Sequence, residues 1–240
     1  MRVAACQVPD VRDDVPRALE IVSEQCAAAY ASAADVVLFP ECFLQGYFTD
    51  RASVERLAVD PGGAAFEPVR AISRRIPVVI VIGLIERTVD VCHNAAVVLK
   101  DGEVIARYRK SALLPGEQGA FDPGSESPVL EIGDRRVGFN ICYDLQFTEL
   151  AAQVADQGGE VLLCPCNNML RTEGAEAWKD QHNAIRADRC RESGLWLVSS
   201  DVTGERDGRI SYGPTAVIDP DGVVVDQVPL STEGMLIADI

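Results

Sequence analysis

The sequence has no concentrated positive charge and no long apolar run. Lys and Arg number 22 against 37 for Asp and Glu, which gives a net charge of -15. An acidic chain without a Lys/Arg cluster repels phosphate backbones and anionic lipids, so we expect no nucleic-acid partner and no membrane partner. No apolar run approaches the roughly 20 residues of a membrane-spanning helix, and the apolar stretch at residues 1–9 is too short for a signal peptide.

The cysteines do not have the arrangement of a disulfide scaffold or of a zinc site. Most of the 8 cysteines lie within apolar runs of the 240-residue chain. We therefore expect them to be reduced core residues of a cytoplasmic protein. Cys164-Pro-Cys166 has no second pair of its kind, and only His93 and His182 are available to complete it. A metal site is therefore not expected.

Short runs of Val, Ile and Leu alternate with helical patterns, which is typical of an α/β protein whose sheets are covered by other layers. With 240 residues, 48% of them hydrophobic, the chain can form one large core, and we expect a single domain over residues 1–240. Strands are expected at residues 2–8, 35–39, 77–85, 94–100, 103–109, 136–142, 160–165 and 195–200. Helices are expected at residues 15–33, 64–75, 147–156 and 178–192.

The second half of the chain repeats the order of the first. Residues 160–165 resemble residues 35–40, and the Asp-Gly turns that end at Gly102 and Gly222 lie half the chain apart. Helices can cover only one face of each half's sheet, so the two bare faces are expected to pack together. The expected fold is a four-layer α-β-β-α sandwich of two pseudo-symmetric halves.

Three chemically different residues, Glu41, Lys110 and Cys142, each follow an apolar run that is expected to be a buried strand. An ammonium near a thiol favours the reactive thiolate. The same cation, with the backbone N–H of Tyr143, can stabilise the oxyanion that forms when a thiolate adds to a substrate carbonyl. A shielded carboxylate with a raised pKa can move the protons. We therefore expect covalent hydrolysis, with Cys142 as nucleophile, Lys110 as cation and Glu41 as acid and base.

The segments around these residues are Phe39-Pro-Glu41, Tyr108-Arg-Lys110 with Leu114-Pro-Gly-Glu117 after it, and Ile141-Cys142-Tyr-Asp144. In this order they resemble the three signature segments of the nitrilase superfamily of carbon-nitrogen hydrolases, and the resemblance extends over nearly all of the chain. It implies a Glu41, Lys110, Cys142 triad, an α-β-β-α sandwich and no cofactor. It also implies a homodimer or higher homo-oligomer, and a second acid at Glu117 that positions the lysine or the substrate.

The Tyr143-Asp144 pair resembles the amidase and carbamoylase branches, whereas nitrile-hydrolysing members typically have Trp-Glu there. The expected reaction is hydrolysis of a non-peptide carbon-nitrogen bond in a small amide or N-carbamoyl compound through a thioester, releasing ammonia or an amine. The chain departs from the family at Phe147-Thr-Glu149 and at residues 164–169. Within the latter segment, Asn167 and Asn168 are expected to line a polar substrate pocket, together with Tyr143.

Several alternatives remain open at this point. The same triad could hydrolyse a nitrile, or the chain could be a non-catalytic regulatory protein that keeps the fold. A papain-like hydrolase would need His93 or His182 as its base, but both are expected to be structural. Arg171, Arg186 and Arg189 are candidate partners for a substrate carboxylate.

Overall fold

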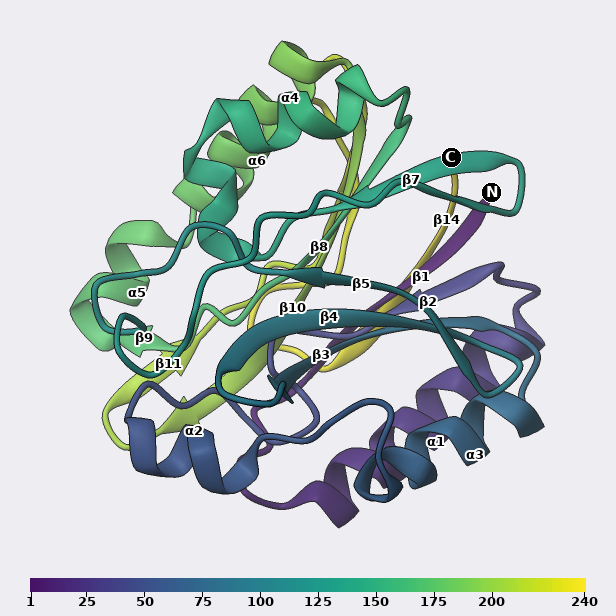
Figure 1. The fold of residues 1–240 in the computed structure, drawn as a ribbon. Coiled ribbons are helices and arrows are strands. Elements are labelled where there is room, and N and C mark those ends of the chain that lie inside the picture. The colour runs from purple at the N-terminus through teal and green to yellow at the C-terminus, as the bar shows by residue number, and fades with distance from the viewer.

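A computed structural model, which describes residues 1–240, shows two halves whose main strands and helices follow the same order along the chain (Figure 1). The first half contains β1 (Arg2–Pro9), α1 (Val15–Ala31), β2 (Val36–Leu38), α2 (Arg51–Leu57), α3 (Glu67–Arg75), β3 (Val79–Arg87), β4 (Cys92–Lys100) and β5 (Glu103–Arg109). The second half contains β6 (Leu130–Ile132), β7 (Arg135–Phe139), α4 (Thr148–Asp156), β8 (Val161–Pro165), β9 (Leu170–Arg171), α5 (Thr172–Trp178), α6 (Gln181–Ser193), β10 (Trp196–Arg206), β11 (Arg209–Ser211), β12 (Ala216–Ile218), β13 (Val224–Gln227) and β14 (Gly234–Asp239). Short 3₁₀ helices span Ala64–Phe66 and Cys142–Gln146.

The strands of the two halves pair in the same way. In the first half β1, β2 and β3 are parallel neighbours, and β4 and β5 follow as antiparallel strands. In the second half β7, β8 and β10 are the parallel neighbours, and β12 and β13 follow antiparallel. The two sheets are joined where the end of β1 pairs with β10, with Gln7 opposite Asp201. The repeated order confirms the predicted pseudo-symmetry.

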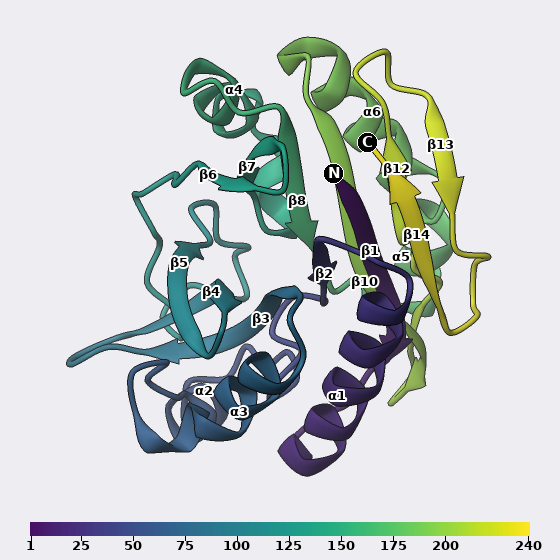
Figure 2. The ribbon, with the colours of Figure 1, turned by 90° about the vertical axis from the view of Figure 1, so that its right-hand side faces the viewer.

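Alternation of side chains along the strands divides the core into layers. On β1, Ala4 and Cys6 belong to a cluster that faces α1 and α3, whereas Val3 and Ala5 belong to a cluster shared with the second sheet. A third cluster packs the second sheet against α4 and α6. Helices therefore lie on both outer sides of the strands, α1 and α3 on one and α4 and α6 on the other, as the two views show (Figures 1 and 2). The four-layer sandwich is confirmed.

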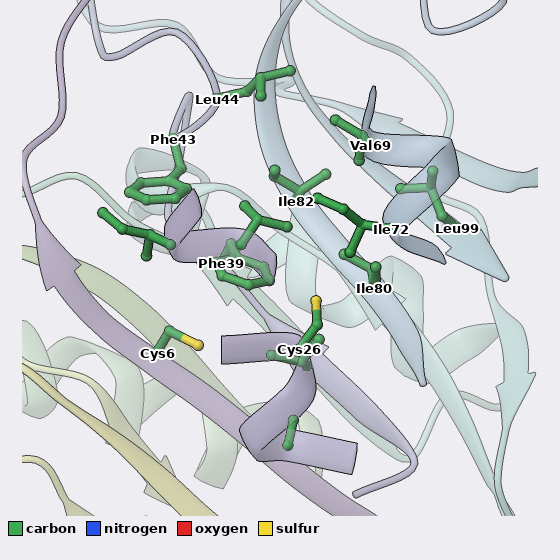
Figure 3. Packing of buried hydrophobic residues seen from close by; sticks show 14 of the residues in the cluster. Cys6, Cys26, Phe39, Phe43, Leu44, Val69, Ile72, Ile80, Ile82 and Leu99 are labelled. Atoms are coloured by element: carbon green, nitrogen blue, oxygen red, sulfur yellow. The ribbon is translucent and has the colours of Figure 1, made fainter. Parts of the chain in front are cut away.

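The helix-side cluster of the first half holds the segment that leads into Glu41. Phe39, directly after β2, stacks on Phe43 with ring centroids 5.8 Å apart. Figure 3 shows both rings gathered with Ile80 and Ile82 of β3. Because this packing surrounds residues 39–43 on the helix side, the intervening carboxylate is carried on a rigid turn.

Several predicted boundaries are wrong for local reasons. The strand expected at 136–142 ends at Phe139, because Cys142 adopts a φ of +44° and begins a 3₁₀ helix. The helix expected at 178–192 begins at Gln181, because the chain turns at residues 179–180 and Trp178 ends the separate α5. The strand expected at 195–200 continues to Arg206. None of the helices combines the length and the apolar character required to cross a bilayer.

Candidate active site

Glu41, Lys110 and Glu117 form one buried cluster, although they lie on three separate segments. Lys110 Nζ donates hydrogen bonds to Glu41 Oε1 at 2.7 Å and to Glu117 Oε1 at 2.9 Å. The side chain of Asn94, on β4, bridges the same two oxygens, with Nδ2 at 2.7 Å and 3.0 Å from them. The other Glu117 oxygen accepts from the backbone N–H of Leu114 at 2.7 Å. One ammonium therefore sits between two carboxylates away from bulk water.

The turn that carries Glu41 depends on close approach of two backbones. Glu41 follows β2 through Pro40, and its N–H donates to Cys166 O at 3.1 Å, on the equivalent turn of the second half. The turn lies against Gly83 of β3, where an added Cβ would be 2.1 Å from Pro40 O and 2.6 Å from Cys42 N. Because no side chain fits there, a glycine in β3 allows the carboxylate to reach Lys110.

Cys142 lies just after β7, where the chain reverses into the 3₁₀ helix Cys142–Gln146. Its φ of +44° is a sparsely populated conformation for a residue with a side chain, and such strain occurs often at reactive positions. Cys142 is half-buried, whereas the other seven cysteines are buried. Cys142 is therefore the most exposed of the eight cysteine residues, and it lines a cavity.

Asp144 ties the nucleophile segment to the lysine segment. It is fully buried and accepts four hydrogen bonds, from Tyr108 OH at 2.8 Å and from the backbone N–H groups of Ser111, Ala112 and Ile141 at 3.1, 2.7 and 2.8 Å. Two of these donors directly follow Lys110, and one directly precedes Cys142. The carboxylate thus fixes residues 108–112, which lie 32 to 36 positions before it in the chain, relative to Ile141 and Cys142.

The charges in the cluster set the protonation of the reactive groups. Burial raises the pKa of Glu41, and the negative charge of Glu117 adds to this, while Lys110 opposes it. Burial would lower the pKa of Lys110, but the charges of Glu41, Cys142 and Glu117 outweigh burial and raise it. Lys110 is therefore a fixed cation, and Glu41 is a carboxylate with increased proton affinity.

The charge of Lys110 lowers the pKa of the Cys142 thiol, which is the direction expected from the sequence, but other groups outweigh it. A hydrogen-bond contact with the Cys166 thiol raises the pKa of Cys142, burial and the charge of Glu41 raise it further, and Lys110 does not compensate. The physical reason is that two carboxylates already neutralise the ammonium. The net effect is that the thiol form of Cys142 is favoured in the resting site.

Asn167 and Asn168 lie in the turn after β8, beside Cys142 and Glu41. Cys142 Sγ lies 3.8 Å from Asn168 Oδ1, in the geometry of a weak thiol hydrogen bond. Asn168 is held by Asp201 of β10, which accepts from its backbone N–H at 3.0 Å and also from its side-chain amide. The N–H of Asn167 donates to Glu41 Oε2 at 3.0 Å. This turn therefore contacts both the nucleophile and the carboxylate.

A cavity of about 250 Å³ opens beside Cys142. Its wall includes Tyr143, Asn167 and Asn168, and otherwise consists largely of apolar side chains from α5, α6 and neighbouring turns. These are Leu114, Leu145, Leu170, Trp178 and Ile185. The three residues predicted to bind substrate therefore border one cavity with the nucleophile, but that cavity is more apolar than predicted because the α5 and α6 side chains cover it.

Of the three candidate arginines, only Arg186 lines this cavity. It is buried, and its guanidinium donates to Cys166 Sγ at 3.2 Å and to Pro214 O at 2.7 Å. His182 also lines the cavity, and burial together with nearby Arg186 lowers its pKa to about 3. A base that weak does not suit the proton transfer that a papain-like mechanism requires.

Sequence reasoning missed Asn94, Asp144 as a hub, and Asp201. Asn94 and Asp201 have a detectable signal, because each is a polar residue in or beside an apolar strand run and therefore needs a buried partner. Nothing in their spacing says which partner that is. No group of three or more His, Cys, Asp or Glu side chains has an arrangement that could hold a metal ion.

Comparison with known proteins identifies the family. The family model described as carbon-nitrogen hydrolase matches residues 2–240. The chain belongs to the carbon-nitrogen hydrolase family. The predicted resemblance to the nitrilase superfamily is thereby confirmed.

Within this carbon-nitrogen hydrolase family, the relatives have different activities. The whole chain matches a glutamine-dependent NAD(+) synthetase of Xanthomonas campestris at 32% identity and spans 44% of its length. It matches an (R)-stereoselective amidase of a Pseudomonas species at 28% identity, over 82% of the chain and 70% of the relative. Among solved structures, an amidase from Nesterenkonia sp. AN1 superposes on the whole chain and 92% of its own length, with a TM-score of 0.88 and 26% identity. The chain spans less than half of the length of the NAD(+) synthetases that it matches.

Proposed function

We propose that the chain hydrolyses a non-peptide carbon-nitrogen bond in a small amide or N-carbamoyl compound, with Cys142 as nucleophile. The observation that carries the proposal is the placement of the half-buried Cys142 thiol in a cavity wall beside Asn168, within electrostatic reach of the buried Glu41 and Lys110. A thiol, a proton acceptor and a fixed cation are the groups that acyl transfer through a thioester requires.

The first half of the reaction follows from the protonation of these groups. Glu41 accepts the proton of Cys142 as the sulfur bonds to the carbonyl carbon, because the resting thiol is not ionised and the carboxylate has a raised pKa. Negative charge moves to the carbonyl oxygen, which Lys110 Nζ and the N–H of Tyr143 stabilise. The carbon-nitrogen bond then breaks, and Glu41 returns the proton to the leaving nitrogen, giving ammonia or an amine and a thioester.

The second half of the reaction regenerates the enzyme. Water attacks the thioester carbon while Glu41 accepts one of its protons, the carbon-sulfur bond breaks, and the sulfur of Cys142 recovers a proton. Glu117 and Asn94 do not exchange protons in this scheme. They hold the oxygen of Glu41 and the nitrogen of Lys110 in place through hydrogen bonds of 2.7 to 3.0 Å.

Related proteins support small amides as substrates. One variant of the amidase from Nesterenkonia sp. AN1 has been captured with acrylamide joined to its active-site cysteine by Michael addition, and another variant has been captured with butyramide. Butyramide would suit the apolar wall of the 250 Å³ cavity beside Cys142. A second candidate is the side-chain amide of glutamine, which the similarity to glutamine-dependent NAD(+) synthetases favours.

The test measures both the released product and the covalent adduct on the enzyme. Wild-type protein is incubated with butyramide, with acetamide and with N-carbamoyl compounds, ammonia is measured, and peptide mass spectrometry after rapid acid quenching locates any acyl group. We expect ammonia release and an acyl mass on Cys142, with both abolished in Cys142→Ala and both retained in Cys190→Ser, a buried thiol of α6 outside the cavity. Ammonia release that persists undiminished in Cys142→Ala would overturn the proposal.

A further inference from the structure

A second and smaller cavity, of about 110 Å³, has arginines as half of its lining residues although the chain has a net charge of -15. Three guanidinium groups come from two separate places, the turn after β1 and the β10–β11 hairpin. The complete lining is Arg12, Tyr47, Thr49, Met169, Arg206 and Arg209. Such a concentration of donors for anions is unexpected in an acidic protein unless something negative binds there.

This cavity borders the active site. The ring of Tyr47, one of its walls, has its centroid 6.0 Å from Lys110 Nζ. Met169, another wall, directly follows Asn168, which contacts the Cys142 thiol. The Tyr47 side chain therefore lies between a group bound among the arginines and Lys110.

The arginines differ in how they are paired. Arg206 is neutralised by Asp10, whose Oδ2 lies 2.6 Å from Nε, and it also contacts Asp207 at 3.3 Å. Arg209 forms no ion pair, and its Nη1 donates only to Met169 O at 3.3 Å. Arg206 thus belongs to the protein's own charge network, whereas Arg209 retains most of its donors.

Arg12 has neither an ion pair nor a hydrogen bond. Its guanidinium lies 3.9 Å from the centroid of the Phe48 ring, and its Nε is buried without a partner. Its backbone is held in place by Gly46, at a φ of +90°, where an added Cβ would lie 2.7 Å from Arg12 Cα. Burial and the charge of Arg206 lower the pKa of Arg12, and the carboxylates of Asp10, Asp207 and Asp50 oppose this shift. A guanidinium that no carboxylate contacts directly keeps its donors available for a bound anion.

We propose that Arg12 and Arg209 bind a carboxylate carried by the substrate, so that this cavity is an anion subsite of the active site. The inference rests on the proposed hydrolysis and adds the substrate class to it. A planar carboxylate matches the fork of a guanidinium, and a single negative charge suits a cavity in which Asp10 and Asp207 already balance Arg206. The same two acids would repel a doubly charged phosphate.

The carboxylate can belong to either side of the bond that breaks. It is part of the acyl group in a dicarboxylic monoamide or in glutamine, and part of the leaving amine in an N-carbamoyl amino acid. Both sources present the same chemistry to Arg12 and Arg209. These two sources can be distinguished with pairs of substrates in which only one member carries the carboxylate.

The experiment measures kcat/KM for two such pairs, glutaramate against pentanamide and N-carbamoylglycine against N-ethylurea. In the wild type we expect the charged member of at least one pair to be favoured at least about tenfold, which is the order expected for charge-assisted hydrogen bonds. Arg12→Gln should reduce that ratio about tenfold, mainly through KM, and Arg209→Gln should reduce it in the same direction. Arg74→Gln, an exposed residue of α3 with the same change of charge, should leave the ratio unchanged.

The outcomes separate this inference from the proposed function. Hydrolysis of the neutral members with no preference for a carboxylate would overturn the anion subsite and leave the hydrolase proposal standing. A preference that Arg12→Gln and Arg209→Gln both preserve would also overturn it. If neither pair is hydrolysed and no other small amide is, both proposals fail. Because Arg209 is exposed, its variant remains informative even if Arg12→Gln does not fold.

Discussion

Replacing Asp144 with Asn should lower both stability and activity, because the carboxylate joins two segments of the active site. Oδ1 accepts from the N–H groups of Ser111 and Ala112, and Oδ2 accepts from Tyr108 and Ile141. An Asn side chain has one acceptor oxygen, so two of the four hydrogen bonds are lost whichever way the amide is oriented. At about 1.5 kcal/mol for each hydrogen bond to a charged acceptor, the free energy of unfolding should fall by about 3 kcal/mol.

The effect on turnover has a separate origin. Asp144 holds the residues next to Lys110 and next to Cys142, so its loss should let the cation and the nucleophile drift relative to each other. A displacement of about 1 Å at a reacting group can cost about 100-fold in rate, and we expect kcat/KM to fall by that order. Urea denaturation gives the first quantity and steady-state hydrolysis of butyramide gives the second.

The matched control is Glu149→Gln, which makes the same chemical change at an exposed position of α4. It should change the free energy of unfolding by less than about 0.5 kcal/mol. If Asp144→Asn were as stable and as active as this control, the reasoning that buried carboxylate bonds align the two segments would be refuted.

Two further predictions concern the backbone and pH. Gly83→Ala should lower the free energy of unfolding by more than about 2 kcal/mol and reduce turnover, because the new Cβ would lie 2.1 Å from Pro40 O. The control in the same urea and activity assays is Gly116→Ala, because a Cβ at Gly116 meets nothing within 4 Å. Burial raises the pKa of Asp201 to about 7 from its ordinary 3.8, so between about pH 4 and pH 7 the folded protein keeps a proton that the unfolded chain has lost. Its contribution to stability should therefore decrease as pH rises through that window, by a few kcal/mol in order of magnitude, and urea titrations should show a smaller decrease in Asp201→Asn; an equal decrease would contradict the assignment.

The arrangement of the cluster also explains why the nucleophile need not be ionised at rest. Glu41 and Glu117 together neutralise Lys110, which leaves the Cys142 thiol protonated. In the proposed reaction Glu41 becomes neutral when it takes that proton, and the charge of Lys110 is then less compensated at the moment when the carbonyl oxygen becomes negative. The proposed mechanism therefore couples proton transfer and oxyanion stabilisation through one oxygen atom, Glu41 Oε1.

The sequence by itself determined the class of fold and the candidate reactive residues. Apolar runs, helical periodicity and the repeated order of elements are local patterns, and local patterns decide which segments become strands and helices. Glu41, Lys110 and Cys142 could be selected because each follows such a run, and parallel strands bring their ends to one edge of a sheet. The boundary at Cys142 could not be predicted, because a positive φ in a residue with a side chain is maintained by its surroundings.

Only the tertiary structure decided which buried polar groups meet. Asn94 bridges two carboxylates from other segments, Asp144 joins segments more than 30 residues apart, and Asp201 holds Asn168 from a strand 33 positions along the chain. Burial and neighbouring charge then set the protonation of these groups, and the packing of the turns leaves Arg12 without a partner. Such contacts arise from the three-dimensional packing of distant segments, which the residue order constrains but does not display, because desolvation and Coulomb interaction depend on distance in space.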